Sequence, residues 1–397
     1  FTAVSAVCVT GLTTVDTATY WSPFGQAVIA AGIVVGGLGV MTLASILGFA
    51  VSRHLGLTQR MLATQETGTG AMGQISLLLK AVIATSLTME ALLAAVFLPR
   101  FLSMGIDPVR AVWDAVFMAI SVFNNAGFVI LPEGLSPHVT DWWMLIPIIL
   151  GTTVGAIGFP VIMDVAKNLR TPRRWRLHTK LTLSTYLILA FVGALALALT
   201  EWNNPATLGA IDTPSKILNA MLAGVNSRSS GLSALDVGAM QTQTHFVQDI
   251  LMMIGGGSAS TAGGVKVTTF AVLVLAVIAE ARGDRDIETF GRRIPTSAVR
   301  LAVAVSLLGL ALVAVSVVLL LSMTNYSLDI ILFETASAFA TVGLSTGITP
   351  ILPVGAKYVL IFLMFAGRTG SMTVAAALAL RERSRVIRMP EERPIIG

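Results

Sequence analysis

The sequence predicts an all-α integral membrane protein in which four pseudo-repeated helix–pore loop–helix modules surround a central pore. Three observations lead to this fold class. The chain is unusually apolar, long apolar segments alternate with helices of half that length, and a glycine motif recurs four times at a nearly constant interval. The repeat weighs most, because an internal repeat of this kind defines the whole architecture.

Composition places the chain among membrane proteins. Of its 397 residues, 55% are hydrophobic and 12% are charged, with a mean hydropathy of +0.82. Soluble domains carry about 25% charged residues. The single cysteine, Cys8, excludes an internal disulfide and a cysteine-based metal site. The four histidines occur singly, without the spacing of metal ligands.

Seven segments are long and apolar enough to cross a bilayer, which takes about 20 residues. Four of them are uncharged, and three contain a charged residue or a glycine-rich break. They are Phe24 to Ser52, Gln74 to Pro99, Trp142 to Met163, Leu181 to Thr200, Ile250 to Ala279, Leu301 to Leu328 and Tyr358 to Leu380. The sequence therefore predicts a multi-pass protein.

Three further helices are too short to cross. Each begins with an N-cap signal. The signals are Asp107 before a proline, Asp212 and Thr213 before another proline, and Ser327. The predicted helices are Pro108 to Phe123, Pro214 to Val225 and Leu328 to Ala340. Helices of this length are either interfacial or re-entrant.

A glycine motif follows each short helix and decides between these two placements. Each glycine comes after a small or β-branched residue and before Leu or Phe, and the start of the chain carries a fourth copy. Gly11, Gly127, Gly231 and Gly343 are separated by 116, 104 and 112 residues. One such glycine would indicate only a turn. Four in register indicate a repeated re-entrant pore loop.

Such loops can form a cation filter. A helix that stops inside the membrane points its partly negative carbonyl end inward, and a glycine loop can present backbone carbonyls to a dehydrated ion. The segment Thr341 to Leu344 is similar to the TVGYG filter of potassium channels. The predicted ion-binding residues are Val9, Thr10 and Gly11, Asn125, Ala126 and Gly127, Ser229, Ser230 and Gly231, and Thr341, Val342 and Gly343.

The repeat divides the chain into four modules. The predicted boundaries are 1–73, 74–179, 180–296 with a broken helix, and 297–397 with a C-terminal tail. Four modules need eight spans and seven are present, so we expect the first helix of the first module to precede Phe1.

Charge predicts the orientation in the membrane. Nineteen of the 26 Lys and Arg lie in the loops and tail opposite the glycine motifs, which indicates that this side is cytoplasmic. The glycine loops and eleven acidic residues then lie outside, where a net negative vestibule would concentrate cations. We expect a plasma-membrane protein with filter loops outside and the C-terminus in the cytoplasm.

Together with the four motifs, three further segments resemble the Ktr/Trk/HKT superfamily of K⁺ and Na⁺ transporters. They are Gly36 to Gly39, Gly255 to Lys266 and Pro390 to Gly397. Within that superfamily the chain is most similar to KtrB, the membrane subunit of bacterial Ktr systems. The resemblance implies K⁺ uptake, with Gly11 favouring K⁺ over Na⁺. It also implies a homodimer and a cytoplasmic ring of RCK-type, KtrA-like regulatory subunits, which alone bind nucleotide.

The resemblance also implies a gate. Gly255 to Gly264 contains five glycines, which a stable helix interior disfavours, so we predict an intramembrane loop below the third filter loop. Close helix packing is the alternative for this stretch. Arg368 lies in mid-span, and we hypothesise that it holds the loop closed. Lys266 either acts similarly or extends to the interface. The predicted gate residues are Gly255, Gly256, Gly257, Ser258, Gly263, Gly264, Lys266 and Arg368.

Three alternatives remain for the function. An Na⁺-permeable or Na⁺-selective uniporter keeps the same architecture. A membrane-embedded enzyme would need a nucleophile with a base or a metal cluster, and the sequence shows neither pattern. A regulatory or scaffold subunit would not need four filter loops. The sequence therefore favours K⁺ as the transported ion and no enzymatic activity.

Overall fold

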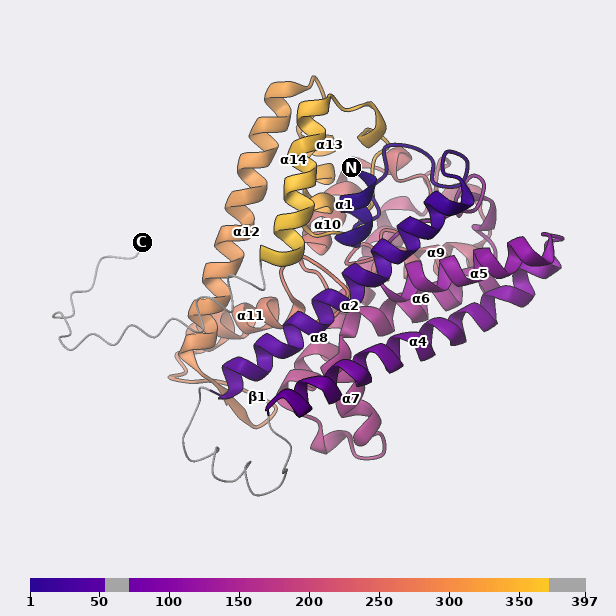
Figure 1. The fold of residues 1–397 in the computed structure, drawn as a ribbon. Coiled ribbons are helices and arrows are strands. Elements are labelled where there is room, and N and C mark those ends of the chain that lie inside the picture. The colour runs from indigo at the N-terminus through magenta and orange to yellow at the C-terminus, as the bar shows by residue number, and fades with distance from the viewer. Residues whose placement is uncertain (54–70, 371–397) are drawn as a thin grey trace.

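The computed structural model describes residues 1–53 and 71–370, and shows a bundle of helices with a short hairpin at one end (Figure 1). The helices are α1 (Thr2–Val7), α2 (Pro23–Arg53), α4 (Ala71–Ser103), α5 (Pro108–Phe123), α6 (Trp142–Ile157), α7 (Phe159–Lys167), α8 (Leu177–Glu201), α9 (Thr213–Asn226), α10 (Thr242–Met253), α11 (Val267–Arg282), α12 (Thr296–Met323), α13 (Leu328–Phe339) and α14 (Val354–Phe365), which a π-helical turn (Ala366–Gly370) continues. The strands are β1 (Ile287–Thr289) and β2 (Arg292–Ile294). Short 3₁₀ turns are Ser136–His138, Pro172–Arg174, Leu208–Ala210, Val237–Ala239 and Thr349–Ile351.

The three predicted short helices are present as α5, α9 and α13, each within a residue of its predicted ends. Asp107 caps α5 as predicted, accepting hydrogen bonds from the Val109 N–H at 3.1 Å and the Arg110 N–H at 3.4 Å. Asp212 and Ser327 occupy the predicted N-cap positions of α9 and α13, but neither makes a side-chain cap bond in the described part of the chain. Proline in the first turn of α9 removes one donor that a cap would satisfy.

Fewer helices qualify as uninterrupted spans than the seven predicted. In the described ranges, the helices long and apolar enough to cross are three: Leu79–Ser103, Leu177–Glu201 and Thr296–Met323. The bent pair α6–α7 makes a fourth if counted as one span, and Pro23–Gly39 is a shorter apolar helix. The second half of the last predicted span, the C-terminal tail and the Pro390 to Gly397 motif lie outside the described residues.

The predicted span from Trp142 to Met163 is not one straight helix, because α6 and α7 meet at a bend of 96°. Gly158 lies at this bend with φ +91°, a backbone conformation that favours glycine. The proline in the first turn of α7 lacks the N–H that a continuous helix would use. The signal was therefore present in the sequence as Gly-Phe-Pro.

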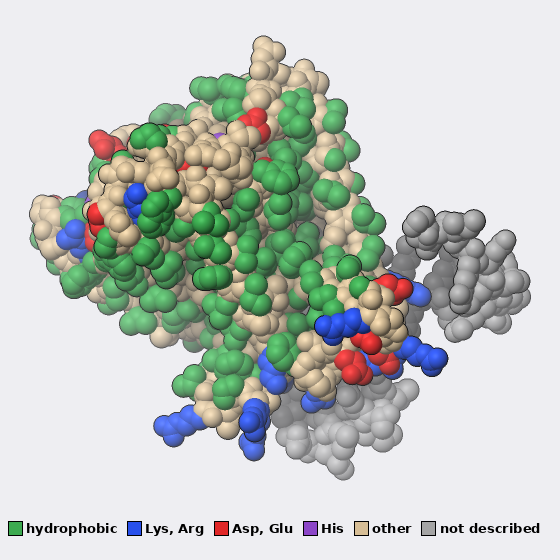
Figure 2. All heavy atoms as spheres, turned by 180° about the vertical axis from the view of Figure 1, so that it is seen from behind, with side chains coloured by type: hydrophobic (Ala, Val, Ile, Leu, Met, Phe, Trp, Pro, Cys, Tyr) green, Lys and Arg blue, Asp and Glu red, His purple; other side chains and the backbone are tan. Residues whose placement is uncertain are grey.

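The surface of the bundle is suited to lipid. Figure 2 shows hydrophobic side chains over the broad middle of one face, with several Lys and Arg side chains at its lower end. Fully apolar side chains such as Phe191, Leu199 and Leu307 are more than 60% exposed. Large exposed apolar areas of this kind mark membrane or protein contact.

The hairpin formed by β1 and β2 is a feature that the sequence analysis missed. The strands pair antiparallel, with Ile287 opposite Ile294. Ile294 is buried with Leu181 of α8 and Ala271 of α11, so the hairpin is anchored to the ends of these two helices. The 282–300 loop, which was predicted only as a basic connection, is therefore partly ordered as a sheet.

Candidate functional site

The four predicted glycine loops meet in a closed ring. This ring consists of four glycines and the residue before each of them. We call it the glycine ring, and its members are Gly11, Gly127, Gly231 and Gly343 with Thr10, Ala126, Ser230 and Val342. A Cβ built on each glycine would lie less than 3.0 Å from the carbonyl oxygen that precedes the glycine of the next loop, in the order one, two, three, four and back to one. Real Cβ atoms essentially never come that close. Glycine is therefore required at all four positions for the loops to close on one another.

The backbone of the ring is also restricted to glycine by its conformation. The four glycines have φ between +58° and +96°. In loops one, two and four, the residue two positions before the glycine also has positive φ: Val9, Asn125 and Thr341 lie between +49° and +57°. In loop three the corresponding strain falls on Ser230, directly before the glycine, at φ +85°. Loop three therefore departs from the pattern of the other three.

Hydrogen bonds show the same exception. In loops one, two and four, the N–H before the glycine donates to the carbonyl five residues earlier, at 2.8 to 2.9 Å. These bonds run from Thr10 to Ser5, from Ala126 to Ser121 and from Val342 to Ser337. In loop three the corresponding bond comes from the N–H of Gly231 itself, to Asn226 at 3.3 Å. The loop has shifted by one residue relative to its helix.

A second set of glycines allows α2, α6 and the turn after α14 to pack against the short helices that precede the ring glycines. A Cβ on Gly36 of α2, Gly155 of α6 or Gly367 after α14 would lie less than 3.0 Å from a carbonyl four residues before a ring glycine. These carbonyls belong to Val7, Phe123 and Phe339. Within the Gly36 to Gly39 motif, Gly36 thus allows backbone-to-backbone packing, in the manner of small residues at membrane helix contacts.

A polar cavity of about 390 Å³ lies over one side of the ring. Three ring glycines, Gly127, Gly231 and Gly343, contribute to its lining. Ser233, Asp236 and Ser345 add hydroxyl and carboxylate oxygens. The cavity is large enough to hold several water molecules and leads to the ring.

The outer part of loop four is held by Glu334, which the sequence analysis treated only as one of the acidic residues of the outer side. This carboxylate is fully buried in α13. It accepts hydrogen bonds from the Ser345 hydroxyl at 2.6 Å, the Thr346 N–H at 2.9 Å and the Thr349 hydroxyl at 2.8 Å. Its signal was a carboxylate nine residues before a motif glycine, in an otherwise apolar helix.

We expect Glu334→Gln to lower the melting temperature of the detergent-solubilised protein by about 5 °C. The amide has one acceptor oxygen in place of two, so buried donors of loop four lose partners at about 1–3 kcal/mol each. A thermal unfolding assay measures the shift. Glu133→Gln makes the same chemical change at an exposed residue and should move the melting temperature by less than about 1 °C. Equal shifts for the two variants would contradict the role given to Glu334.

The predicted gate residues Gly255 to Lys266 lie between α10 and α11, and Arg368 lies in the turn after α14. Thr261 lies 2.6 Å from the Asn125 side chain of loop two, and Gly263 packs against Thr341 of loop four. The glycine-rich loop therefore contacts loops two and four, and its place below loop three stays a prediction. The Asn125 amide turned the other way also reaches the Ser229 hydroxyl at 2.9 Å, which would tie loop two to loop three.

The glycine-rich loop is tied to α6 at the bend. The Gly257 N–H donates to the Ala156 carbonyl at 2.7 Å, and the Phe159 N–H donates to the Ala259 carbonyl at 3.2 Å. A Cβ on Gly158 would lie within 3.0 Å of the Ser258 carbonyl. The break in α6–α7 and the break in α10–α11 therefore form one contact, which no sequence pattern pairs.

The loop closes on itself through its glycines. Gly255 packs against the Gly263 carbonyl so closely that a Cβ has no room, and Ile254 pairs with Val265 in an isolated bridge. The Ser258 and Thr268 hydroxyls lie 3.0 Å apart. The Lys266 ammonium donates to the Ala262 carbonyl within the loop. The alternative of extending to the interface is therefore not the conformation that Lys266 adopts.

Arg368 connects three elements at the centre of the bundle. It lies in the π-helical turn after α14 and is 3% exposed. Its Nη1 donates to the Thr261 carbonyl in the glycine-rich loop, and its Nη2 donates to the Gly36 carbonyl of α2 at 3.3 Å. Contact with a loop carbonyl is the geometry that the sequence analysis hypothesised for Arg368.

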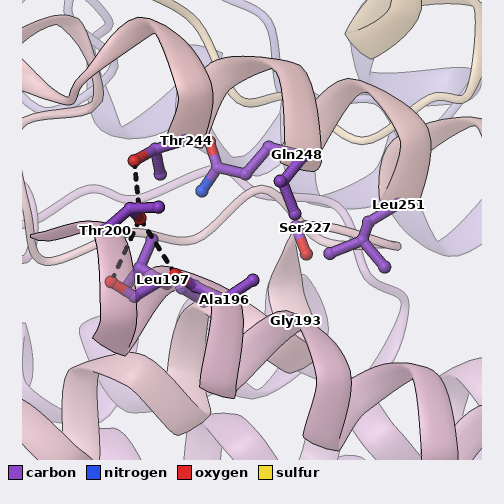
Figure 3. A pocket seen from close by; sticks show the side chains of 10 residues that line it. Gly193, Ala196, Leu197, Thr200, Ser227, Thr244, Gln248 and Leu251 are labelled. Atoms are coloured by element: carbon purple, nitrogen blue, oxygen red, sulfur yellow. Dashed lines mark hydrogen bonds between the residues drawn. The ribbon is translucent and has the colours of Figure 1, made fainter.

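A small cavity lies behind loop three, between α8, α9 and α10 (Figure 3). It measures about 10 Å³, which is room for one water molecule. Thr200 and Thr244 lie at one end with their hydroxyl oxygens 2.8 Å apart, and Ser227 and Gln248 lie at the other (Figure 3). The cavity is far too small for a permeation path.

The side predicted to lie outside carries less exposed charge than expected. Five of the charged residues assigned to it are buried inside the bundle instead. They are Asp114, Glu201, Arg228, Asp249 and Glu334. Glu201, for example, accepts hydrogen bonds from Asn204 and Thr207 at 2.6 Å. The predicted negative vestibule therefore overestimates the field at the surface, because buried carboxylates act on the loops that they bind.

Apolar helices combined with short helices that end in glycine loops characterise membrane transport proteins. The chain belongs to the TrkH family of cation transport proteins, whose family model matches residues 1–387. This confirms the resemblance found in the sequence, and it places the chain among cation transporters rather than enzymes.

Relatives of known name support this placement. The chain is 38% identical over 397 residues to the Ktr system potassium uptake protein B of Bacillus subtilis, covering 100% of this chain and 88% of that one. It is 33% identical over 409 residues to the potassium/sodium uptake protein NtpJ of Enterococcus hirae, covering 100% and 89%. The potassium transporter TrkH of Vibrio parahaemolyticus shares the fold, with a TM-score of 0.72 at 18% identity over 95% of this chain and 76% of that one.

Proposed function

We propose that the protein takes up K⁺ across the plasma membrane and that the glycine ring is its selectivity filter. The observation that carries this proposal is the cyclic contact of four loops, each placing a backbone carbonyl against the glycine of its neighbour. Backbone carbonyls gathered in this way can replace the hydration shell of an alkali cation. The ion-binding residues are those predicted, from Val9 to Gly11, Asn125 to Gly127, Ser229 to Gly231 and Thr341 to Gly343.

K⁺ is proposed as the principal ion. Relatives from B. subtilis and Vibrio alginolyticus are named potassium uptake proteins. Gly11 occupies the first loop, where the sequence resemblance associates glycine with K⁺ and serine with Na⁺. The name of NtpJ includes sodium, so an Na⁺-permeable transporter of the same architecture is the second candidate.

The fourfold modular architecture belongs to the same proposal. The shared hydrogen bonds of loops one, two and four support it, as do the glycines that pack α2, α6 and the turn after α14 on the short helices. The modules keep the predicted boundaries 1–73, 74–179, 180–296 and 297–397. Glycine loops face outward and the C-terminus faces the cytoplasm, as the distribution of Lys and Arg predicts.

Regulation is proposed to act from the cytoplasm. The relatives' designation as Ktr system proteins indicates a system with more than one component. We propose that this chain is a homodimer regulated by a ring of RCK-type subunits, which bind the nucleotide. The glycine-rich loop, Gly255 to Gly264 with Lys266, is the gate, and Arg368 holds it closed through the Thr261 carbonyl.

Flux in liposomes tests the function. We expect the full-length protein to carry K⁺ at least about tenfold faster than Na⁺, a difference of about 1.4 kcal/mol. Gly127→Ser adds a side chain at φ +72° against the Ser230 carbonyl and should reduce this preference strongly. Gly134→Ser is the matched control, because Gly134 has φ +66° with nothing within 4 Å of an added Cβ.

The outcomes separate the candidates. Equal K⁺ and Na⁺ flux in the wild type would favour the second candidate, an Na⁺-permeable transporter. Equal effects of Gly127→Ser and Gly134→Ser would remove the filter assignment. No flux of either ion, with the cytoplasmic partner present, would remove the transport proposal.

A further inference from the structure

Loop three contains a buried arginine side chain, Arg228, that the proposed function does not yet use. Arg228 lies three residues before Gly231, and its side chain is fully buried. None of its three side-chain nitrogens has a hydrogen-bond partner among the described residues. No carboxylate of the described ranges forms an ion pair with it either. A guanidinium stays protonated in proteins, so a full positive charge lies behind this loop.

The contact that holds Arg228 is an aromatic ring. Its guanidinium carbon lies 3.6 Å from the centre of the Tyr186 ring of α8. Tyr186 is itself fully buried. A desolvated cation over an aromatic face is stabilised, but less than by a carboxylate, and the charge is not neutralised.

The other three loops carry no such charge at the equivalent position. The residues three before the other ring glycines are Cys8, Asn124 and Ala340. Asn124 donates to the Glu90 carboxylate of α4 at 2.8 Å, so the same position in loop two faces a carboxylate. Loop three is also the loop whose hydrogen bonds and positive φ are shifted by one residue. Among the four loops, loop three therefore carries the one charged residue at this position.

We propose that Arg228 is an affinity-determining residue of the glycine ring: its unpaired charge, held on the Tyr186 face, weakens cation binding at loop three and so speeds ion release. This inference rests on the proposed filter function. Three residues span at most about 11 Å of backbone, so the charge acts on the ring at short range. In a buried site this repulsion is hardly screened by salt.

A selectivity filter needs a repulsive interaction that limits how tightly it binds the ion. Conduction requires binding strong enough to admit the ion and weak enough to release it. Four loops of carbonyls attract the ion from every side. A fixed positive charge behind one loop opposes this attraction without entering the permeation path.

Neutral and charged substitutions test the proposal. We expect Arg228→Gln and Arg228→Met to lower the KM for K⁺ by about tenfold and to reduce the maximal flux by a similar factor. Arg228→Lys keeps the charge and should leave KM within about twofold. Tyr186→Phe keeps the aromatic face and serves as a control that should match the wild type. The KM change should persist when the ionic strength is raised with an impermeant salt.

A second readout does not need flux. The K⁺ concentration that gives half of the maximal thermal stabilisation reports binding directly. It should fall about tenfold in both neutral variants. If the wild type carried no flux, the proposed transport function would fail, and this titration would still decide the role of Arg228.

Three results would overturn the inference. One is an unchanged half-maximal K⁺ concentration and KM in the neutral variants, with only stability reduced, which would make Arg228 a packing residue. A second is failure of both neutral variants to fold while Arg228→Lys folds normally, which would show that the charge serves the structure. A KM change that disappears at high ionic strength would also contradict a buried origin.

Discussion

Gly343→Ala is expected to abolish K⁺ flux, with a loss of at least about 100-fold in liposomes. Gly343 has φ +96°, and an added Cβ would meet the Thr10 carbonyl of loop one closer than 3.0 Å. The positive φ alone costs about 1–3 kcal/mol for a residue with a side chain. The clash adds to this, because its partner is a backbone atom fixed by the Thr10 N–H bond to Ser5 at 2.8 Å. The ring cannot close at the point where loops four and one meet.

Gly347→Ala is the matched control for this prediction. Gly347 lies four residues later with φ +92°, and nothing lies within 4 Å of an added Cβ. The two substitutions therefore share the conformational cost and differ in the contact with loop one. We expect Gly347→Ala to retain flux within about threefold. Similar losses in both variants would show that backbone strain, and not the closure of the ring, accounts for the effect.

Arg368→Ala is expected to raise K⁺ flux in the absence of any cytoplasmic partner by about tenfold or more. The substitution removes both bonds of the guanidinium, to the Thr261 and Gly36 carbonyls. Hydrogen bonds to a charged group contribute about 1.5–3 kcal/mol each. Losing even one of them from the closed arrangement would shift a two-state gate by about tenfold or more. Flux assays with the membrane protein alone measure this change.

Arg368→Lys separates the charge from the geometry. Lysine keeps the positive charge but cannot hold two carbonyls in the planar fork that arginine provides. If the connection between loop and α2 closes the gate, the lysine variant should behave like alanine. If the charge is the barrier to cations, it should behave like the wild type. Unchanged flux in both variants would remove Arg368 from the gate.

Loop three differs from the other three loops of the glycine ring in its backbone hydrogen bond. Loops one, two and four share the hydrogen bond from the residue before the glycine, whereas loop three shifts it to Gly231. Module three also contains the break between α10 and α11, where the proposed gate lies, just as module two contains the break between α6 and α7. The filter exception and the proposed gate therefore occur in the same module. Loops one, two and four can keep the ring closed while the conformation of the third module changes.

Much of the site was predictable because it depends on local sequence. The short helices were found within a residue of their ends from proline and apolar length. The four glycines were found because each lies at a fixed distance from its own helix. The break between α10 and α11 was also predicted, since five glycines among ten residues cannot form a stable helix interior.

Contacts between distant segments were not predictable. The bend at Gly158, the contact of the glycine-rich loop with loops two and four, and the burial of Glu334 and Arg228 all depend on which backbone meets which side chain.

By itself, the sequence determined the membrane class, the repeat and the identity of the ring glycines, because hydropathy and backbone conformation are properties of neighbouring residues. The tertiary structure decided that each glycine faces the carbonyl of the next loop and that Arg228 lies on Tyr186 without a counter-charge. These contacts join residues from different modules or elements. Their energies depend on burial and distance, which the order of residues does not contain.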